Sequence, residues 1–509
     1  MGTRLRRTLR CSISILGIAS LLTVSASAAE PAPALKAGFA ERDITPELGM
    51  EQPGGYGKSY HTSFHDPCKV RAAVFDDGKI RVALVGVDGG FVYRHLVQAA
   101  RKGIHQKCGI PPEAVLIGAS HSHSAGPLGI VQPGQYDHAS PLVRSLAYEK
   151  SACADPRYLE KVRQEIVAAV CQADSARLEA RCGVGRGVED KVAFNRRLRM
   201  KDGRTYTHPG QGNPEIAGYA GPTDPEVGVL GAWNREGKML GCVVNFACHA
   251  TTSPGGISAS YVYYLEQTIR GCMGKECVVV FLQGFSGDVT QVDNLSPHPY
   301  PAPEDWARQV GGRIGAEAVK ALLGMEPGAL APLAARSQVL QINRRVPSPE
   351  RVRRSYELVK KDPKEAGYTE WAFAKEIVLL DALLAKGRAE EVEVQAVQIG
   401  PAVFLANPAE MFCQYGLDLK AKGRFPFTFP VGYANGFAGY VPTQEAFGQH
   451  GGGYETRLTS CSNLEAAAGQ RIVDASLDLA APLTPGKVPE RAKAPPFRGS
   501  IRPVPPELE

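Results

Sequence analysis

Short apolar runs alternate with segments of helical spacing along most of this chain. The apolar runs predict buried strands, and they cover residues 70–75, 80–87, 114–117, 241–246, 277–282 and 392–405. Apolar residues recur at helical intervals in residues 92–106, 156–173 and 305–323. Strands that alternate with helices are typical of an α/β architecture whose sheet is largely covered. We therefore expect an α/β protein in which a single large domain carries a mixed β-sheet covered by helices.

One charged segment interrupts this alternation. Residues 348–386 show helical spacing, and their apolar faces are supplied by Leu358, Ile377, Leu379, Leu380 and Leu383. This pattern predicts a helical hairpin that lies on the domain. A solvated insertion without a function of its own is the preferred interpretation of such a segment.

The two ends of the chain differ from its centre. A basic start is followed by an apolar stretch over residues 13–24 and by the small residues 26–28. This order predicts a signal peptide over residues 1–28 and a linker over 29–35, and hence a secreted or periplasmic protein. The main domain is expected over residues 36–480. Eight prolines after residue 481 predict an extended, proline-rich tail over residues 481–509.

Composition and charge limit the classes of protein to consider. The chain has 509 residues, of which 44% are hydrophobic and 22% are charged, and this composition excludes disorder for most of its length. The formal net charge of +6 falls to about +2 without the four arginines of the predicted signal peptide, so no basic surface indicates a nucleic-acid partner. No later segment has the roughly 18 consecutive apolar residues of a spanning helix, so stable membrane insertion is not expected.

Eleven of the twelve cysteines lie outside the predicted signal peptide. No C-x-x-C pair occurs among them, which gives a thiolate zinc site little support, whereas an oxidising compartment favours disulfides. Cys272 and Cys277 form the simplest local pair. Two buried free thiols are an equally good interpretation of these two positions.

Polar residues that could carry chemistry follow four of the predicted strands. His121 and His123 follow the predicted strand over 114–117, and residues i and i+2 of an extended chain point to the same face. His249 follows the strand over 241–246, and a glycine-containing loop over 284–290 follows the strand over 277–282. Glu410 follows the strand over 392–405. The carboxyl ends of strands are where α/β sheets bind ligands, so we expect the site there. Histidine and carboxylate ligands are typical of a hydrolytic zinc site, and manganese or iron accepts a similar set.

Eight short motifs occur in a fixed order along the chain. They are Asp43-Ile44-Thr45-Pro46, Gly55-Tyr56-Gly57, Ser120-His121-Ser122-His123-Ser124, Asn195-Arg196, Ala247-Cys248-His249-Ala250-Thr251, Gly287-Asp288-Val289-Thr290, Pro408-Ala409-Glu410, and the stretch from Asn435 through Tyr440-Val441-Pro442-Thr443. In this order they resemble the amino-terminal catalytic domain of the neutral (non-lysosomal) ceramidase family, over about residues 36–480.

The resemblance implies an activity and a set of site residues. The residues implied as zinc ligands are His121, His249, Glu410 and Tyr440. The resemblance places His123, Arg196 and Tyr454 on the substrate side, where they would stabilise negative charge at a carbonyl. The implied reaction is the zinc-dependent hydrolysis of the N-acyl amide bond of ceramide or a similar N-acylated amphiphile, so the expected partner is a lipid or small-molecule substrate.

Three features of the chain depart from the family. Thr290 stands at the position of the family's catalytic serine, so the resemblance implies a catalytic role for it. Its hydroxyl is kept, whereas its extra methyl group stiffens the side chain. Cys248 stands where the family has threonine, and the proline-rich tail stands where the family continues into an immunoglobulin-like domain. Two alternatives therefore stay open: a metallohydrolase of altered specificity for another amide or ester, and a binding protein that keeps the metal site without catalysis.

Overall fold

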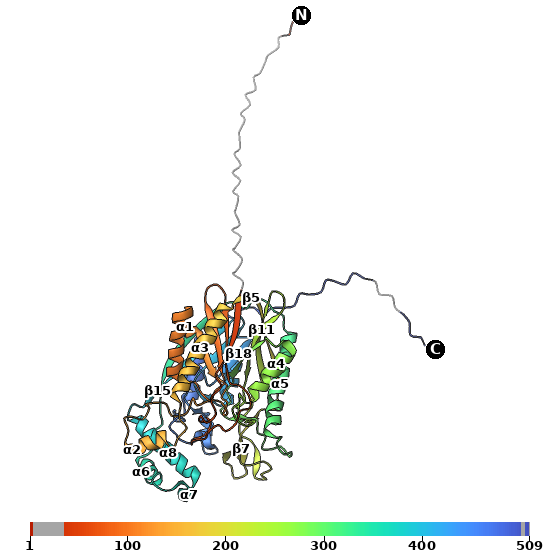
Figure 1. Ribbon diagram of the computed structural model, residues 1–509. Helices are drawn as coiled ribbons and strands as arrows, with labels where there is room; N and C mark the ends of the chain where they lie inside the picture. The colour runs from red at the N-terminus through yellow and green to blue at the C-terminus, as the bar shows by residue number, and fades with distance from the viewer. Residues whose placement is uncertain (4–34, 500–503, 508–509) are drawn as a thin grey trace. The chain divides into compact units, whose positions relative to one another are not determined.

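Two β-sheets form the centre of the protein, and helices cover them from both sides (Figure 1). The structure is a computed structural model that describes residues 1–3, 35–499 and 504–507. The chain divides into Met1–Pro33 and Ala34–Glu509, and every element named below belongs to the second unit. The predicted signal peptide falls almost wholly on residues 4–34, which lie outside the described residues.

The larger sheet has eight strands in the order β12-β11-β10-β5-β1-β2-β3-β4. Neighbouring strands run antiparallel except at the two edges, where β11 pairs with β12 and β3 pairs with β4 in parallel. The strands are β1 (Lys36–Asp43), β2 (Lys69–Asp76), β3 (Arg81–Val87), β4 (Val115–Ala119), β5 (Leu178–Val188), β10 (Glu226–Asn234), β11 (Met239–Phe246) and β12 (Val278–Gln283). The mixed sheet expected from the sequence is confirmed.

The two edges of this sheet pack against one another, since β12 contacts β2 and β3. Gly86 of β3 lies directly against the backbone of Phe281 in β12, where a Cβ atom would come within 2.5 Å of the Phe281 carbonyl oxygen. Glycine is the residue that permits this close approach of two backbones. The contact brings the carboxyl ends of the two parallel strand pairs into one region.

The second sheet has four strands in the order β14-β15-β16-β18. They are β14 (Leu333–Asn343), β15 (Ala389–Ile399), β16 (Ala402–Ala406) and β18 (Phe427–Val431). Smaller sheets are formed by β6 (Phe194–Asn195) with β13 (Val289–Thr290), by β17 (Glu410–Met411) with β19 (Tyr440–Val441), and by β7 (Arg197–Met200), β8 (Thr205–Thr207) and β9 (Ile216–Tyr219). The two smallest sheets tie together loops that follow the longer strands.

Helices pack in pairs on the sheets. The α-helices are α1 (Arg94–Cys108), α2 (Pro141–Tyr148), α3 (Pro156–Ser175), α4 (Tyr261–Met273), α5 (Pro303–Gly324), α6 (Pro349–Leu358), α7 (Pro363–Ala366), α8 (Tyr368–Leu384), α9 (Cys413–Lys422) and α10 (Ala468–Ala480). The 3-10 helices are η1 (Pro112–Ala114), η2 (Gln444–Phe447) and η3 (Tyr454–Thr456). In Figure 1, α1 and α3 lie on one side of the strands and α4 and α5 on the other, and α3 packs on β1 and β2 while α5 packs on β5 and β10.

The predicted strand over residues 392–405 is wrong in one respect. The structure divides this apolar stretch into β15 and β16, which pair antiparallel with Ile399 opposite Ala402. Gly400 makes the tight turn with a φ of +57°, a left-handed conformation that glycine adopts without strain. Both strands are buried on both faces near the turn, so their apolar runs join in the sequence and hide the reversal.

The charged segment 348–386 differs from expectation in its burial. Its helices α6 and α8 pack on each other as the predicted hairpin requires, with the short helix α7 between them. Helix α8 is largely buried, and even Lys375 and Glu376 are each only 1% exposed. The interpretation of this segment as a solvated insertion is therefore wrong for α8.

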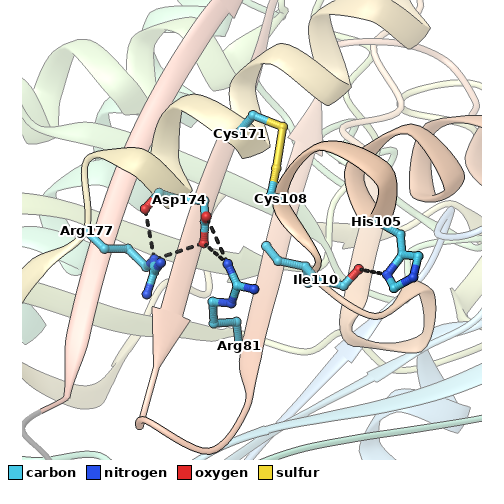
Figure 2. The surroundings of a disulfide bond; sticks show 7 residues. All are labelled: Arg81, His105, Cys108, Ile110, Cys171, Asp174 and Arg177. Carbon is cyan, nitrogen blue, oxygen red and sulfur yellow. Dashed lines mark hydrogen bonds and ion pairs between the residues drawn. A yellow bond between two sulfur atoms is a disulfide. The ribbon is translucent and has the colours of Figure 1, made fainter.

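The disulfide pairing predicted from the sequence is wrong as well. Cys272 is exposed and free, and Cys277 is buried and free. The structure instead joins Cys108, at the end of α1, to Cys171 in α3, across 63 residues of sequence (Figure 2). Asp174, one turn further along α3, accepts a hydrogen bond from Arg81 at 3.0 Å and pairs with Arg177. These contacts fasten the two helices to each other and to β3.

The beginning of the proline-rich tail rests on the second sheet. The backbone N–H of Gly486 donates to the carbonyl of Gly400 at 3.0 Å, and the side-chain amide of Gln398 donates to the carbonyl of Thr484 at 2.7 Å. Residues 483–499 contain no helix or strand. Over the described parts of the chain, no helix combines the length and the apolar character that crossing a membrane requires.

Candidate metal centre

The side chains singled out in the sequence meet where several strands end. His121 lies just after β4 and His249 just after β11. Glu410 and Tyr440 occupy paired positions on the short parallel strands β17 and β19. Each of these residues therefore reaches the site from a different strand.

Three acceptor atoms converge at the centre of this cluster. The Oε2 atom of Glu410 lies 3.3 Å from Nε2 of His121 and 3.5 Å from Nε2 of His249. All three side chains are almost completely buried, and Glu410 Oε2 has no hydrogen-bond donor within the described residues. An unpaired buried carboxylate oxygen is costly, and a cation is the group that relieves it.

The outer nitrogens of the two imidazoles fix the inner ones as acceptors. His121 Nδ1 lies 2.9 Å from the carbonyl oxygen of Gly90, and His249 Nδ1 lies 2.6 Å from that of Ser286. A carbonyl oxygen only accepts, so in each ring Nδ1 carries the proton and Nε2 presents its lone pair to the centre. Metal-binding histidines are usually oriented by a hydrogen bond of this kind.

The protonation states suit a cation-binding site. Burial, followed by the charge of Arg196, lowers the pKa of His249 to about 3, so the imidazole is neutral near pH 7. Burial by itself would raise the pKa of Glu410, but interactions with His121 and His249 bring it well below its usual range. Neutral imidazoles and an ionised carboxylate are the forms that bind a divalent metal.

His123 lies in the same cluster as His121 and His249. The ligand atoms of the three histidines all lie within 4.8 Å of one another, and Nε2 of His123 is 3.1 Å from Nε2 of His121. Burial and the two neighbouring imidazoles lower the pKa of His123 well below its usual value. The position admits His123 as a third nitrogen ligand, as an alternative to the substrate-side role implied by the resemblance.

Arg196 points one edge of its guanidinium group at the cluster. Its Nη1 lies 3.3 Å from Nε2 of His249, while Nε donates to Glu455 at 2.7 Å and Nη2 donates to the carbonyl of Gly287 at 2.6 Å. Burial acts to lower the pKa of Arg196, but the neighbouring Tyr454, Tyr440 and Glu455 raise it, so the side chain stays cationic. A fixed, buried cation is thus held beside the site.

Tyr440 and Tyr454 meet over this guanidinium group. Their hydroxyl oxygens are 2.9 Å apart, and the centroids of their rings lie 5.3 Å and 5.0 Å from the Arg196 guanidinium carbon. The ring of Tyr440 stacks at 6.4 Å on the ring of His249. Burial raises the pKa of both phenols, so both are protonated. The structure brings Tyr440 and Tyr454 into the site, and the hydroxyl of each has the other as its hydrogen-bond partner.

Thr290 is buried near the site, but its hydroxyl is engaged in its own loop. Its Oγ1 accepts a hydrogen bond from the backbone N–H of Val292 at 3.0 Å. Within the described residues, the hydroxyl makes no hydrogen bond to a histidine or to Glu410. The neighbouring Asp288 likewise serves the scaffold, because it accepts from Asn195 at 2.8 Å and from the N–H of Cys413 at 2.7 Å.

Two residues of the site were missed in the sequence. Glu455 is fully buried and holds both Arg196 and Thr207, at 2.7 Å and 2.6 Å. It follows Tyr454 directly in the sequence, and this adjacency could have pointed to it. Tyr433 stacks on the ring of His121 with centroids 4.2 Å apart, and its sequence surroundings carry no signal for that contact.

Strained backbone is concentrated around these residues. His121, Tyr433 and Asn435 have φ angles of +62°, +54° and +63°, in a region that residues other than glycine seldom adopt. Asn435 is held by its side chain, which accepts from the N–H of Ile117 at 3.1 Å and donates to Gln395 at 2.7 Å. Strain of this kind persists only where the surroundings enforce it, and it is typical of functional sites.

A cavity of ≈ 270 Å³ lies beside the cluster. Phe437 lines it, and the ring of Phe437 packs at 3.8 Å on Phe91, whose ring lies 5.4 Å from that of His121. Tyr93 and charged side chains such as Arg344 complete the lining. The cavity is of mixed polarity, and the rings of Phe437 and Phe91 lie between it and His121.

The residues present fit a divalent metal ion. They combine two or three oriented imidazole nitrogens with one buried, unpaired carboxylate oxygen, which is a donor set suited to zinc and acceptable to manganese or iron. The fold and the site together define an α/β protein with a candidate metal centre at the carboxyl ends of its strands.

Comparison with solved structures identifies that fold. The chain is similar to the crystal structure of neutral ceramidase from Pseudomonas aeruginosa, with a TM-score of 0.64 and 20% sequence identity over 91% of this chain and 77% of that one. It is equally similar to a structure described as ceramidase complexed with C2, with a TM-score of 0.64 and 19% identity over the same shares of the two chains. The chain thus has the neutral ceramidase fold, and the resemblance seen in the motifs is confirmed at that level. No protein-family model and no curated protein matches the chain.

Proposed function

We propose that this protein is an exported, zinc-dependent amidohydrolase that cleaves the N-acyl amide bond of ceramide or a similar N-acylated amphiphile. The observation that carries the proposal is the convergence of Nε2 of His121, Nε2 of His249 and the unpaired Oε2 of Glu410. The likeness to neutral ceramidases supports the amide substrate. The basic and apolar start of the sequence supports export.

We propose that His121, His249, Glu410 and Tyr440 hold the metal. A zinc ion in this position supplies Lewis-acid chemistry, which polarises a carbonyl group and makes water acidic enough to ionise near neutral pH. The hydrogen bonds from His121 to Gly90 and from His249 to Ser286 engage Nδ1 of each ring, so that Nε2 of each ring is the nitrogen that faces the centre. The site is therefore preorganised for the ion.

The remaining polar residues act on the substrate. Arg196 is cationic, and Glu455 and the Gly287 carbonyl fix two of its nitrogens, so Nη1 can donate to a substrate oxygen without reorganisation. His123 and the hydroxyl of Tyr454 are the further donors that we propose for a developing oxyanion. Preorganised donors of this kind typically contribute on the order of 100-fold or more each to the rate of acyl transfer.

Thr290 is proposed to order the glycine-containing loop. Its hydroxyl is bonded to the N–H of Val292, two residues further on. The same loop supplies the Ser286 carbonyl that orients His249 and the Gly287 carbonyl that orients Arg196. The hydroxyl thus supports the loop that aligns the site, and it needs no role as a nucleophile.

The test is the release of fatty acid from a short-chain fluorescent ceramide by the purified full chain. Turnover should disappear with a chelator and return when zinc is added. His249→Ala should be inactive with or without added zinc, whereas His298→Ala, at an exposed histidine, should behave as the wild type. Absence of chelator-sensitive turnover on ceramide and on simpler acyl amides would refute the proposal.

A further inference from the structure

Two adjacent, oppositely charged residues are buried in the middle of α8. Lys375 and Glu376 are each 1% exposed, and Nζ of Lys375 lies 3.3 Å from Oε1 of Glu376. Burying two charges is unfavourable before their attraction is counted, and apolar residues of similar size often stabilise a helix as well or better. The stability of α8 alone therefore does not explain why these two charged side chains are buried.

Lys375 reaches out of α8 to the loop that contains Tyr56. Its ammonium group donates to the carbonyl oxygen of Tyr56, to Oγ of Ser151 at 2.6 Å, and to the carbonyl of Lys150 at 3.3 Å. The ring of Tyr56 also packs on that of Phe373, two residues earlier in α8, with centroids 5.6 Å apart. Helix α8 thus holds Tyr56 by its backbone and by its side chain.

The loop held in this way touches the site histidine His123. Residues 51–60 form a loop closed by the N–H of Gln52, which donates to the carbonyl of Ser59 at 2.9 Å. The side chain of Gln52 donates to the carbonyl of His123 at 3.2 Å. At Gly54 a Cβ atom would come within 2.4 Å of Nδ1 of His123, so the loop lies directly on the imidazole ring.

Glu376 reaches a second segment that contacts the site. It accepts hydrogen bonds from Oγ of Ser460 at 2.5 Å and from the N–H of Ser460 at 3.3 Å. Two residues further on, Oγ of Ser462 accepts from the N–H of Tyr440 at 3.0 Å. Neighbouring residues of one helix therefore support the segment behind Tyr440 and the loop in front of His123.

We propose that Lys375 and Glu376 are positioning residues, and that segment 348–386 supports the site through them. Lys375 sets the 51–60 loop against His123, and Glu376 sets the 460–462 segment against Tyr440. The kinetic consequence rests on the proposed function, whereas the structural consequence does not. Displacement of a catalytic group by about 1 Å can cost on the order of 100-fold in rate.

The test compares two double variants of the full chain. Lys375→Met with Glu376→Gln removes both buried charges together, so neither is left unpaired. Lys360→Met with Glu357→Gln is the matched control, because this pair belongs to the same segment, lies 2.9 Å apart and is 55% and 66% exposed. Ser460→Ala is a milder variant that removes a neutral partner of Glu376, and it serves if the first double variant does not fold.

Three quantities are measured on each variant: hydrogen exchange of the Gln52 and His61 amides, zinc content, and kcat with KM. Both amides are hydrogen-bonded within the loop region, to Ser59 and to Met50 at 2.9 Å each. In the double variant Lys375→Met with Glu376→Gln, called the buried variant, we expect hydrogen exchange of both amides to be about tenfold faster or more. We expect kcat to be lower by about tenfold or more, with little change in KM or zinc content. In Ser460→Ala, we expect kcat to fall as well, but by less than in the double variant. The control should match the wild type throughout.

Unchanged exchange at Gln52 and His61 in the buried variant would overturn the role of Lys375, whatever the enzyme's substrate is. A variant with a lower melting temperature but an unchanged kcat per folded molecule would show a merely structural pair and would also overturn the proposal. If the wild type hydrolyses no amide, the exchange measurement still decides the positioning role, so the two failures are distinguishable.

Discussion

The Nε2 atoms of His121 and His123 lie 3.1 Å apart. Two nitrogens that bind one zinc ion at about 2.0–2.1 Å would have a similar separation, and so would two nitrogens that share a hydrogen bond. The hydrogen bonding of Nδ1, the other nitrogen of each ring, distinguishes a metal ligand from a hydrogen-bond partner of the ligand. Nδ1 of His121 is oriented by the Gly90 carbonyl, whereas Nδ1 of His123 lies beside Gly54 and makes no hydrogen bond within the described residues. We therefore propose the ligand role for His121 and the substrate role for His123.

This assignment predicts different losses for the three histidines. His121→Ala and His249→Ala should lose bound zinc, because each removes an oriented lone pair. His123→Ala should keep the metal and lose activity by on the order of 100-fold or more. Metal analysis and turnover of the three variants, with His298→Ala as control, check the prediction. A metal-free His123→Ala protein would make His123 a third ligand and contradict the assignment.

Glu455 should act through Arg196. Glu455→Gln keeps the shape of the side chain but weakens the bond at 2.7 Å that fixes the guanidinium group. We expect turnover to fall by about tenfold or more while zinc content is unchanged. Glu445→Gln is a suitable control, because Glu445 pairs with Arg199 on the surface and is 74% exposed. Equal activities of the two variants would show that Glu455 does not position Arg196.

The hydroxyl of Thr290 should matter for the loop more than for the reaction. Thr290→Val keeps the volume and removes the bond to the Val292 N–H, which we expect to lower the free energy of unfolding by about 1 kcal/mol. Turnover should stay within about tenfold of the wild type, and Thr290→Ser should be closer still. Denaturant unfolding and the ceramide assay measure the two effects. Complete loss of turnover in a folded, zinc-loaded Thr290→Val protein would give the hydroxyl a direct catalytic role.

The disulfide between Cys108 and Cys171 should stabilise the packing of α1 on α3. Replacing both cysteines by serine is expected to lower the free energy of unfolding by about 2–4 kcal/mol, because the bond closes a loop of 63 residues. Cys272→Ser, at an exposed free thiol, should leave stability unchanged. Thermal unfolding with and without reductant provides the measurement. A double variant as stable as the oxidised wild type would indicate that the bond does not form in the protein.

Local patterns in the sequence predicted much of the fold. Buried strands such as β4 and β12 contain uninterrupted apolar runs, so their positions follow directly from the sequence. The turn at Gly400 was missed because apolar residues flank it on both sides. The pairing of Cys108 with Cys171 was missed because it depends on how two helices pack, and sequence spacing carries no information about that.

The site was predicted unevenly for a similar reason. His121 and His249 follow apolar strands, so the pattern of strands located them. The structure adds the direction of each ring, which depends on carbonyl groups at Gly90 and Ser286. The buried pair in α8 was hidden within a charged segment, where Lys375 and Glu376 look like ordinary surface residues.

The most direct test of the metal centre is an anomalous difference map, recorded at the zinc absorption edge from crystals of the zinc-loaded protein. We expect one strong peak at about 2.0–2.2 Å from Nε2 of His121, from Nε2 of His249 and from the Glu410 carboxylate, with the Tyr440 oxygen next to it. A map without a peak between these three side chains, or with the zinc bound elsewhere, would contradict the account.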